Sequence, residues 1–101
     1  MASKRQMAKF LREVANRIET FGWIQGSFGD ESKGFCVLGA TSGMGAGAVT
    51  TTKAWKAVKL TNNFDLNRGI ADWNDQPGQC QKDVLCGLRK AARALEHGLK
   101  V

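Results

Sequence analysis

The sequence lacks tyrosine, has one histidine, one proline and three cysteines, and contains no long apolar run. Because a membrane-spanning helix needs about 18 or more apolar residues, no membrane partner is predicted. The N-terminal segment also lacks the apolar centre of a secretion signal, so we expect a cytoplasmic protein. An odd number of cysteines without a Cys-x-x-Cys pair fits reduced, buried thiols better than a disulfide framework.

The small number of cysteines and histidines disfavours a bound metal or cofactor. A zinc site needs about four ligands, and Cys36, Cys80 and Cys86 have only His97 to join them. Their spacing matches no common zinc-binding pattern. His97 fits better as a cation near the C-terminal end of a helix. We therefore expect no bound metal and no cofactor.

Hydrophobic content and positive charge are present in quantity. The chain has 101 residues, 43% of them hydrophobic, which fits a single domain over 1–101 with a core that needs no disulfide. Fifteen lysines and arginines against nine aspartates and glutamates give a net charge of +6. This excess favours acidic partners such as nucleic acid or an acidic protein surface.

Two amphipathic helices are predicted at the ends of the chain. Over 3–21 apolar side chains recur at helical spacing, Ser3 and Gln6 fit a capping box, and a glycine follows. A second helix is predicted from 79–81 to about 97. Because neither helix is stable alone at this length, we expect the two to pack together. Their polar faces carry the basic residues predicted to contact a partner: Arg5, Lys9, Arg12, Arg89, Lys90 and Arg93.

The middle of the chain is less regular. Residues 22–34 hold four glycines and a polar run, which indicates a loop or a short β-hairpin around 30–33. Residues 50–61 predict a third helix with a threonine N-cap. In it Trp55 and Val58 face the core. Lys53 and Lys56 belong to a basic run and are also predicted to contact the partner.

Leu66 and Ile70 are spaced for one or two further helical turns. Together these patterns predict a mainly α fold, a small single-domain bundle of three to five helices with a glycine-rich loop or hairpin near 22–34.

The glycine-rich segment 35–49 resembles the nucleotide-binding turn of short-chain dehydrogenases, which offers backbone amides to a phosphate. A dehydrogenase is disfavoured because the rest of the chain is too short for the remaining strand and helix units and supplies no tyrosine base. Two interpretations stay open: close packing or flexibility of this loop, and an anion-binding nest for phosphate or a nucleotide. The nest would use Gly39, Thr41, Ser42, Gly43 and Gly45.

Three short segments carry a second resemblance. They are Gly-Trp-x-Gln-Gly at 22–26, Cys-x-x-Gly-Ala at 36–40 and Trp-Asn-Asp-x-Pro-Gly at 73–78. In this order they resemble an uncharacterised family of small actinobacterial and actinophage proteins. The family usually has Arg-Thr after Pro-Gly, where this chain has Gln79-Cys80, so the chain resembles a divergent, phage-borne member. The resemblance implies no function, and it implies that Cys-x-x-Gly-Ala opens a helix.

The residues of these segments are predicted to have structural roles. Trp23 and Trp73 lie beside turns, where large aromatic side chains commonly anchor a loop to the core. Asn74 and Asp75 fit an Asx-type turn that satisfies local amides. Gln25 is expected to serve its own loop.

Cys36 and Asp75 are the candidate reactive groups if the protein is an enzyme. The sequence offers neither of them a neighbouring histidine, so no catalytic pairing is predicted.

The favoured function is a small non-enzymatic binding protein of phage origin that engages a host macromolecule through basic helix faces. Its partner is nucleic acid or an acidic protein surface. Two alternatives remain: a binder of nucleotide or phosphate at the loop 39–47, and an enzyme of unknown reaction that uses Asp75 or Cys36.

Overall fold

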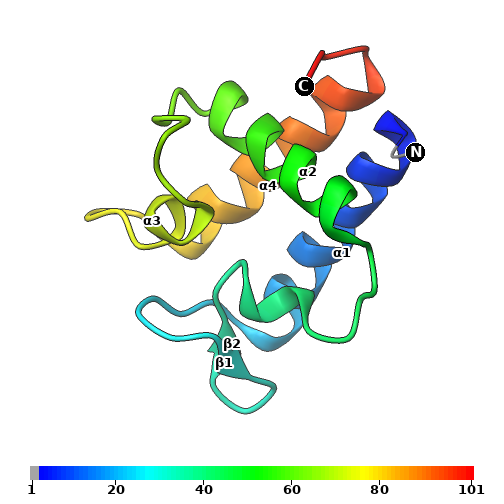
Figure 1. The fold of residues 1–101 in the computed structure, drawn as a ribbon. Helices are drawn as coiled ribbons and strands as arrows, with labels where there is room; N and C mark the ends of the chain where they lie inside the picture. The colour runs from blue at the N-terminus through cyan, green and yellow to red at the C-terminus, as the bar shows by residue number, and fades with distance from the viewer. Residues whose placement is uncertain (1–2) are drawn as a thin grey trace.

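The computed structural model describes residues 3–101, and in this part of the chain four α-helices share one hydrophobic core (Figure 1). The elements confirm the predicted mainly α fold. The helices are α1 (Lys4–Phe21), α2 (Ala48–Thr61), α3 (Ile70–Asn74) and α4 (Gln81–Glu96). Between α1 and α2 lie the antiparallel strands β1 (Gly29–Asp30) and β2 (Gly34–Phe35) and a short 3-10 helix, η1 (Gly39–Thr41).

Helix α1 begins as predicted. Ser3 Oγ accepts a hydrogen bond from the Gln6 N–H at 3.0 Å, and the Ser3 N–H donates to Gln6 Oε1 at 3.0 Å, which completes the capping box. The helix buries Met7, Ala8, Phe10, Leu11, Val14, Ala15 and Ile18.

Helices α1 and α4 pack antiparallel, which confirms the predicted contact between the terminal helices. Lys4 Nζ, at the start of α1, donates to the Gly98 carbonyl just past the end of α4 at 2.9 Å. At the other end, Arg89 of α4 pairs with Glu19 of α1 at 3.2 Å. The start of α1 and the end of α4 therefore lie together, at the far side of the molecule from the hairpin (Figure 1).

Helix α2 packs against both α1 and α4. Trp55 and Val58 are buried as predicted, and the Trp55 ring lies edge-on to Phe10 of α1 with centroids 5.2 Å apart. The predicted threonine N-cap is wrong, because α2 begins after Gly47, whose φ is 84°. The chain enters this helix through a conformation that glycine adopts without a Cβ penalty. Thr51 lies inside the helix, and its hydroxyl donates back to the Gly47 carbonyl at 2.8 Å.

The segment before α3 is a loop, so the helical turn predicted to include Leu66 is wrong. The Leu66 side chain is 47% exposed. Lys59 Nζ donates to the carbonyls of Leu66 at 3.4 Å and Arg68 at 3.0 Å. These bonds satisfy backbone groups that a helix would have paired internally.

Residues 22–34 form the hairpin alternative of the prediction. The Asp30 carboxylate closes its turn, since Oδ1 accepts from the Ser32 hydroxyl at 2.6 Å and from the Ser32 and Lys33 N–H groups at 2.9 Å each. The hydrogen bond from the Ser32 hydroxyl is the main cause that lowers the pKa of Asp30. Strand β2 also pairs with the chain that leaves α1, because the Phe35 N–H donates to the Gly22 carbonyl at 2.9 Å.

The prediction of buried thiols is correct for Cys36 alone. Cys80 and Cys86 are exposed, and all three cysteines are free. Cys86 lies two residues from the buried Val84 and Leu88, and residues two apart on a helix point about 200° away from each other. Its thiol therefore points away from the core.

Candidate functional site

Asn74, at the end of α3, connects the three motif segments. Its side chain is fully buried and is the one buried polar side chain in residues 3–101. Oδ1 accepts from Trp23 Nε1 at 2.8 Å and from the Val37 N–H at 3.0 Å. Nδ2 donates to the Ile24 carbonyl at 3.1 Å and to Asp75 Oδ1 at 2.8 Å. Both lone pairs and both hydrogens of the amide are therefore used.

This geometry corrects two sequence predictions. Asn74 does not form a local Asx turn, since its carboxamide bonds groups far away in the sequence. Gln25 does not serve its own loop, because its Nε2 donates to the carbonyls of Asn74 at 3.2 Å and Gln76 at 3.1 Å. The Gly26 N–H donates to Asp75 Oδ1 at 3.2 Å. The loop after α1 is thus bonded along the end of α3.

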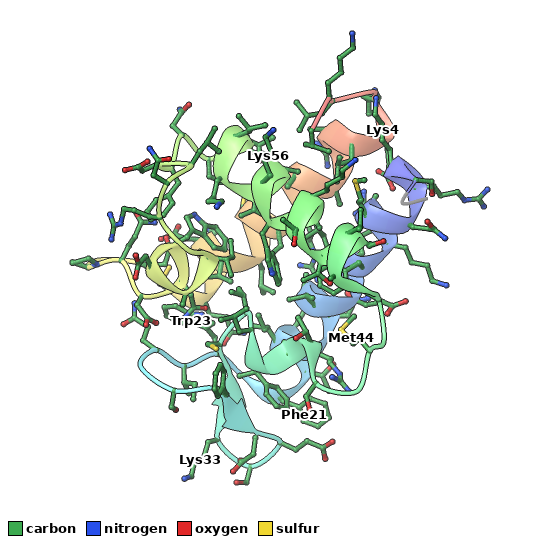
Figure 2. All side chains as sticks on the ribbon, viewed as in Figure 1. Lys4, Phe21, Trp23, Lys33, Met44 and Lys56 are labelled. Carbon is green, nitrogen blue, oxygen red and sulfur yellow. The ribbon has the colours of Figure 1, made fainter. Side chains whose placement is uncertain are left out.

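The two motif tryptophans anchor this arrangement, as predicted. Figure 2 shows Trp23 between the hairpin and α3, where its indole N–H reaches Asn74. Trp73 is buried against α4 at Gly87. A Cβ on Gly87 would lie 2.6 Å from the edge of the Trp73 ring, so the close approach of α3 to α4 requires a glycine there.

Cys36 lies where β2 leads into η1. Its Sγ accepts the Gly39 N–H at 3.3 Å, and η1 begins at Gly39. The Cys-x-x-Gly-Ala segment therefore opens a helix, as the resemblance implied, although the helix is a single 3-10 turn. Gly39 also packs directly against the Phe28 carbonyl.

A pocket of about 380 Å³ lies where these segments meet, close to the lower end of the volumes typical of ligand sites. Its wall is mostly apolar, with the Asp75 carboxylate as its charged group. The lining residues are Gly26, Ser27, Phe28, Cys36, Leu38, Ala71, Asn74 and Asp75.

The pocket brings together the two candidate reactive groups, Cys36 and Asp75. No histidine lines it, and His97 lies past the end of α4, so neither group has the base that nucleophilic catalysis uses. Within residues 3–101, no three His, Cys, Asp or Glu side chains lie close enough to hold a metal ion.

Four residues of the pocket wall, Ser27, Phe28, Leu38 and Ala71, were missed from the sequence. The available signal was a large aromatic side chain, Phe28, placed in a glycine-rich polar loop. Phe28 is 67% exposed, which is unusual for phenylalanine.

The glycine loop proposed to hold an anion is folded onto itself. The N–H groups of Ala40, Thr41, Ser42 and Met44 donate to carbonyls three or four residues earlier. Arg17 of α1 donates to the carbonyls of Ala40 and Ser42. The arginine nearest this loop therefore binds backbone oxygens, and the four amides already have acceptors.

Arg12 and Arg89 lie at the boundary between α1 and α4. Arg12 Nη2 donates to Glu96 Oε1 at 2.6 Å, and Arg89 pairs with Glu19, so two ion pairs cross between the helices. Arg12 lies about 200° around α1 from Phe10, the residue that contacts α2. Both pairs are therefore on the side of α1 and α4 that faces away from α2.

Lys56 lies on the exposed side of α2 (Figure 2), and Lys53 of the same helix is also exposed. The predicted basic residues therefore lie on three helices, and of these Arg12 and Arg89 pair across the boundary between α1 and α4. Arg5, Lys9, Lys90 and Arg93 are exposed and make no ion pair with any residue in 3–101.

The Arg12 to Glu96 pair predicts a shifted carboxyl titration. The hydrogen bond from Arg12 lowers the pKa of Glu96. In Arg12→Met we expect the Glu96 pKa to rise toward its ordinary value, measured by NMR titration of the side-chain carboxyl carbon. Because the folded-state pKa is the lower one, the pair stabilises the fold above the unfolded-state pKa and this stabilisation is lost as the pH falls through the folded-state pKa.

Lys9→Met is the matched control for this titration, because Lys9 is exposed on the same helix and makes no ion pair with any residue in 3–101. It should leave the Glu96 pKa unchanged. An unchanged Glu96 pKa in Arg12→Met would contradict the assigned cause.

Comparison with known proteins assigns a family to this architecture. Within residues 3–101 no helix has both the length and the apolar content to cross a membrane. No curated protein and no solved structure matches the chain significantly. A family model described as a family of unknown function (DUF6197) matches residues 2–94, a span that includes all three motif segments and the pocket. The chain therefore belongs to this family of unknown function.

Proposed function

We propose that the protein is a small non-enzymatic binding protein that engages an acidic macromolecule through the basic face of α1 and α4. The resemblance to actinophage proteins supports a phage origin and a partner from the host cytoplasm. The antiparallel packing of α1 and α4 is the observation that carries the proposal, because it brings Arg12 and Arg89, far apart in sequence, to the same boundary between two helices.

The charge distribution supports this face as the contact surface. Apart from Arg17, which binds loop carbonyls, helices α1 and α4 together carry eight lysines and arginines against four carboxylates. The segments 22–47 and 62–80 carry two cations and five carboxylates. The positive charge is therefore concentrated on the helices, where it attracts an acidic partner over a Debye length of about 8–10 Å at ordinary salt.

The two cross-helix ion pairs give this surface a defined shape. Glu96 and Glu19 hold the Arg12 and Arg89 side chains across the boundary between α1 and α4. Each guanidinium has five donors, so a paired arginine can still donate to a phosphate or carboxylate of a partner. Arg5, Lys9 and Arg93 flank the pairs without such carboxylate contacts.

A charge-reversal experiment tests the proposal. The double variant Arg5→Glu with Arg93→Glu changes two exposed residues of the α1 and α4 face. We expect it to weaken binding to a DNA duplex or to poly-glutamate by about tenfold or more at low salt, because two cations that release counterions are lost. The salt dependence of DNA binding should fall as well, because fewer phosphates are contacted. Fluorescence anisotropy across a salt series measures both quantities.

Lys53→Glu with Lys56→Glu is the control, because it makes the same change in net charge on the face of α2. It should weaken binding much less. Equal losses in both double variants would contradict a specific face, and no binding to either polyanion at low salt would overturn the proposal. Recovery of a partner from host lysate with and without nuclease then separates nucleic acid from an acidic protein.

A further inference from the structure

The apolar pocket between the hairpin loop and α3 is lined by one charged group, the Asp75 carboxylate, and one of its oxygens makes no hydrogen bond within residues 3–101. The Asp75 carboxylate accepts the Gly26 N–H and an Asn74 amide hydrogen, and both bonds go to Oδ1. Oδ2 makes no hydrogen bond and no ion pair with any residue in 3–101. A carboxylate has about four acceptor sites on its two oxygens. Asp75 is exposed and lines the pocket, so Oδ2 is available to a ligand.

The pocket lies in the acidic part of the protein. Its walls come from segments 22–47 and 62–80, which carry five carboxylates and only two cations, Lys33 and Arg68. Arg68 is already held by Asp72 at 3.4 Å and lies over the Phe64 ring, 4.8 Å from its centroid. Lys33 is at the hairpin turn (Figure 2). The local charge around Asp75 therefore favours a positive ligand and disfavours a phosphate.

The rest of the wall favours an apolar body of limited size. Phe28 and Leu38 supply apolar surface, and the volume of about 380 Å³ fits a small molecule of one or two rings. The Phe28 ring is largely exposed, and an aromatic face also attracts organic cations. Burial of this ring by a ligand would remove one of the larger exposed apolar side chains from water.

We propose that this pocket binds a small organic cation, a primary ammonium group on a compact aromatic or aliphatic body. The ammonium group donates to Asp75 Oδ2, and the body packs on Phe28 and Leu38. This site is separate from the basic face of α1 and α4 and does not depend on it, so charge reversal at Arg5 and Arg93 should leave it intact.

Protein NMR with two matched probes tests the site. We expect 2-phenylethylamine to shift the backbone amide signals of Gly26 and Ser27 and the indole N–H signal of Trp23. These shifts should reach a plateau as the probe concentration rises. We expect 3-phenylpropionate, which has a similar body and the opposite charge, to leave these signals unshifted. The Trp23 signal is informative because its N–H bonds to Asn74, beside Asp75.

Variants then separate charge from shape. Asp75→Asn keeps an acceptor for the Gly26 N–H but removes the charge, and should weaken amine binding by about tenfold or more, as expected for loss of a charge-assisted bond. Phe28→Ala changes an exposed side chain and should weaken it as well. Asp72→Asn removes the same charge from α3 outside the pocket and should change affinity less than twofold. Similar shifts with both probes, or unchanged affinity in Asp75→Asn, would overturn the proposal.

Discussion

Asn74→Leu is expected to lower the free energy of unfolding by about 3–5 kcal/mol, a large share of the roughly 5–15 kcal/mol of a typical domain. Leucine is similar in size but has no donor or acceptor. It leaves the Trp23 indole N–H, the Val37 N–H and the Ile24 carbonyl without their partner. Each buried polar group left unpaired costs about 1–3 kcal/mol. Urea unfolding followed by circular dichroism measures the loss.

Two further variants separate the contribution of the network from that of one ordinary hydrogen bond. Gln79→Leu removes a single bond, from Nε2 to the Trp73 carbonyl at 3.0 Å, and should cost only about 0.5–1.5 kcal/mol. An equal loss in Asn74→Leu would contradict the central role of Asn74. Asn74→Asp keeps an acceptor for Trp23 but turns a carboxylate oxygen toward the Ile24 carbonyl and Asp75. Its cost should be largest at neutral pH and shrink in acid, because burial beside another carboxylate raises the pKa of the new group.

The terminal helices could be predicted because their pattern is local. Helical spacing of apolar residues, a capping box at Ser3 and glycines after each helix all depend on neighbours within a few positions. The start of α2 could not be predicted in this way. Gly47 begins the helix without a side-chain cap, and the threonines that follow are ordinary helical residues.

The site was recognised in part. The three motif segments were identified, but the sequence does not specify which distant groups a carboxamide will bond. An Asn-Asp pair beside a proline fits a local turn equally well, whereas Asn74 bonds Trp23, Ile24 and Val37 across the fold. The role of Phe28 in the pocket wall was not predicted for the same reason. Its neighbours are set by tertiary packing, and no periodic pattern marks it.

Charge was the least predictable property at the level of single residues. Arg12 and Arg89 were predicted to contact a partner, and the sequence did not indicate that both pair with carboxylates of the opposite helix. A helical pattern locates the polar face, but the register between two packed helices decides which opposite charges meet. That register depends on core packing between α1 and α4, which neither helix encodes alone.

Gly39→Ala is expected to destabilise the fold by about 2–3 kcal/mol, although alanine is normally the better residue in a helical turn. A Cβ on Gly39 would lie 1.8 Å from the Phe28 carbonyl oxygen and 2.6 Å from its carbon. The atoms that the new Cβ would overlap belong to the Phe28 backbone, so no side-chain rotation relieves the overlap. Moving Phe28 away would also stretch the bond in which its carbonyl accepts the Cys36 N–H at 3.3 Å. Urea unfolding measures the stability, and the amide signals of Cys36 and Phe28 report the local shift.

Gly69→Ala is the control for this close approach, because a Cβ there meets nothing within 4 Å and its φ of −72° suits any residue. Its effect should stay within about 0.5 kcal/mol, as for an ordinary surface change. Gly39 also has no positive φ, so a loss confined to Gly39→Ala must come from the contact with Phe28 and not from backbone strain. Equal stability of the two variants would show that Phe28 moves freely. Because Phe28 is a wall of the pocket, that result would also mean that the pocket adjusts its shape to a ligand instead of presenting a fixed one.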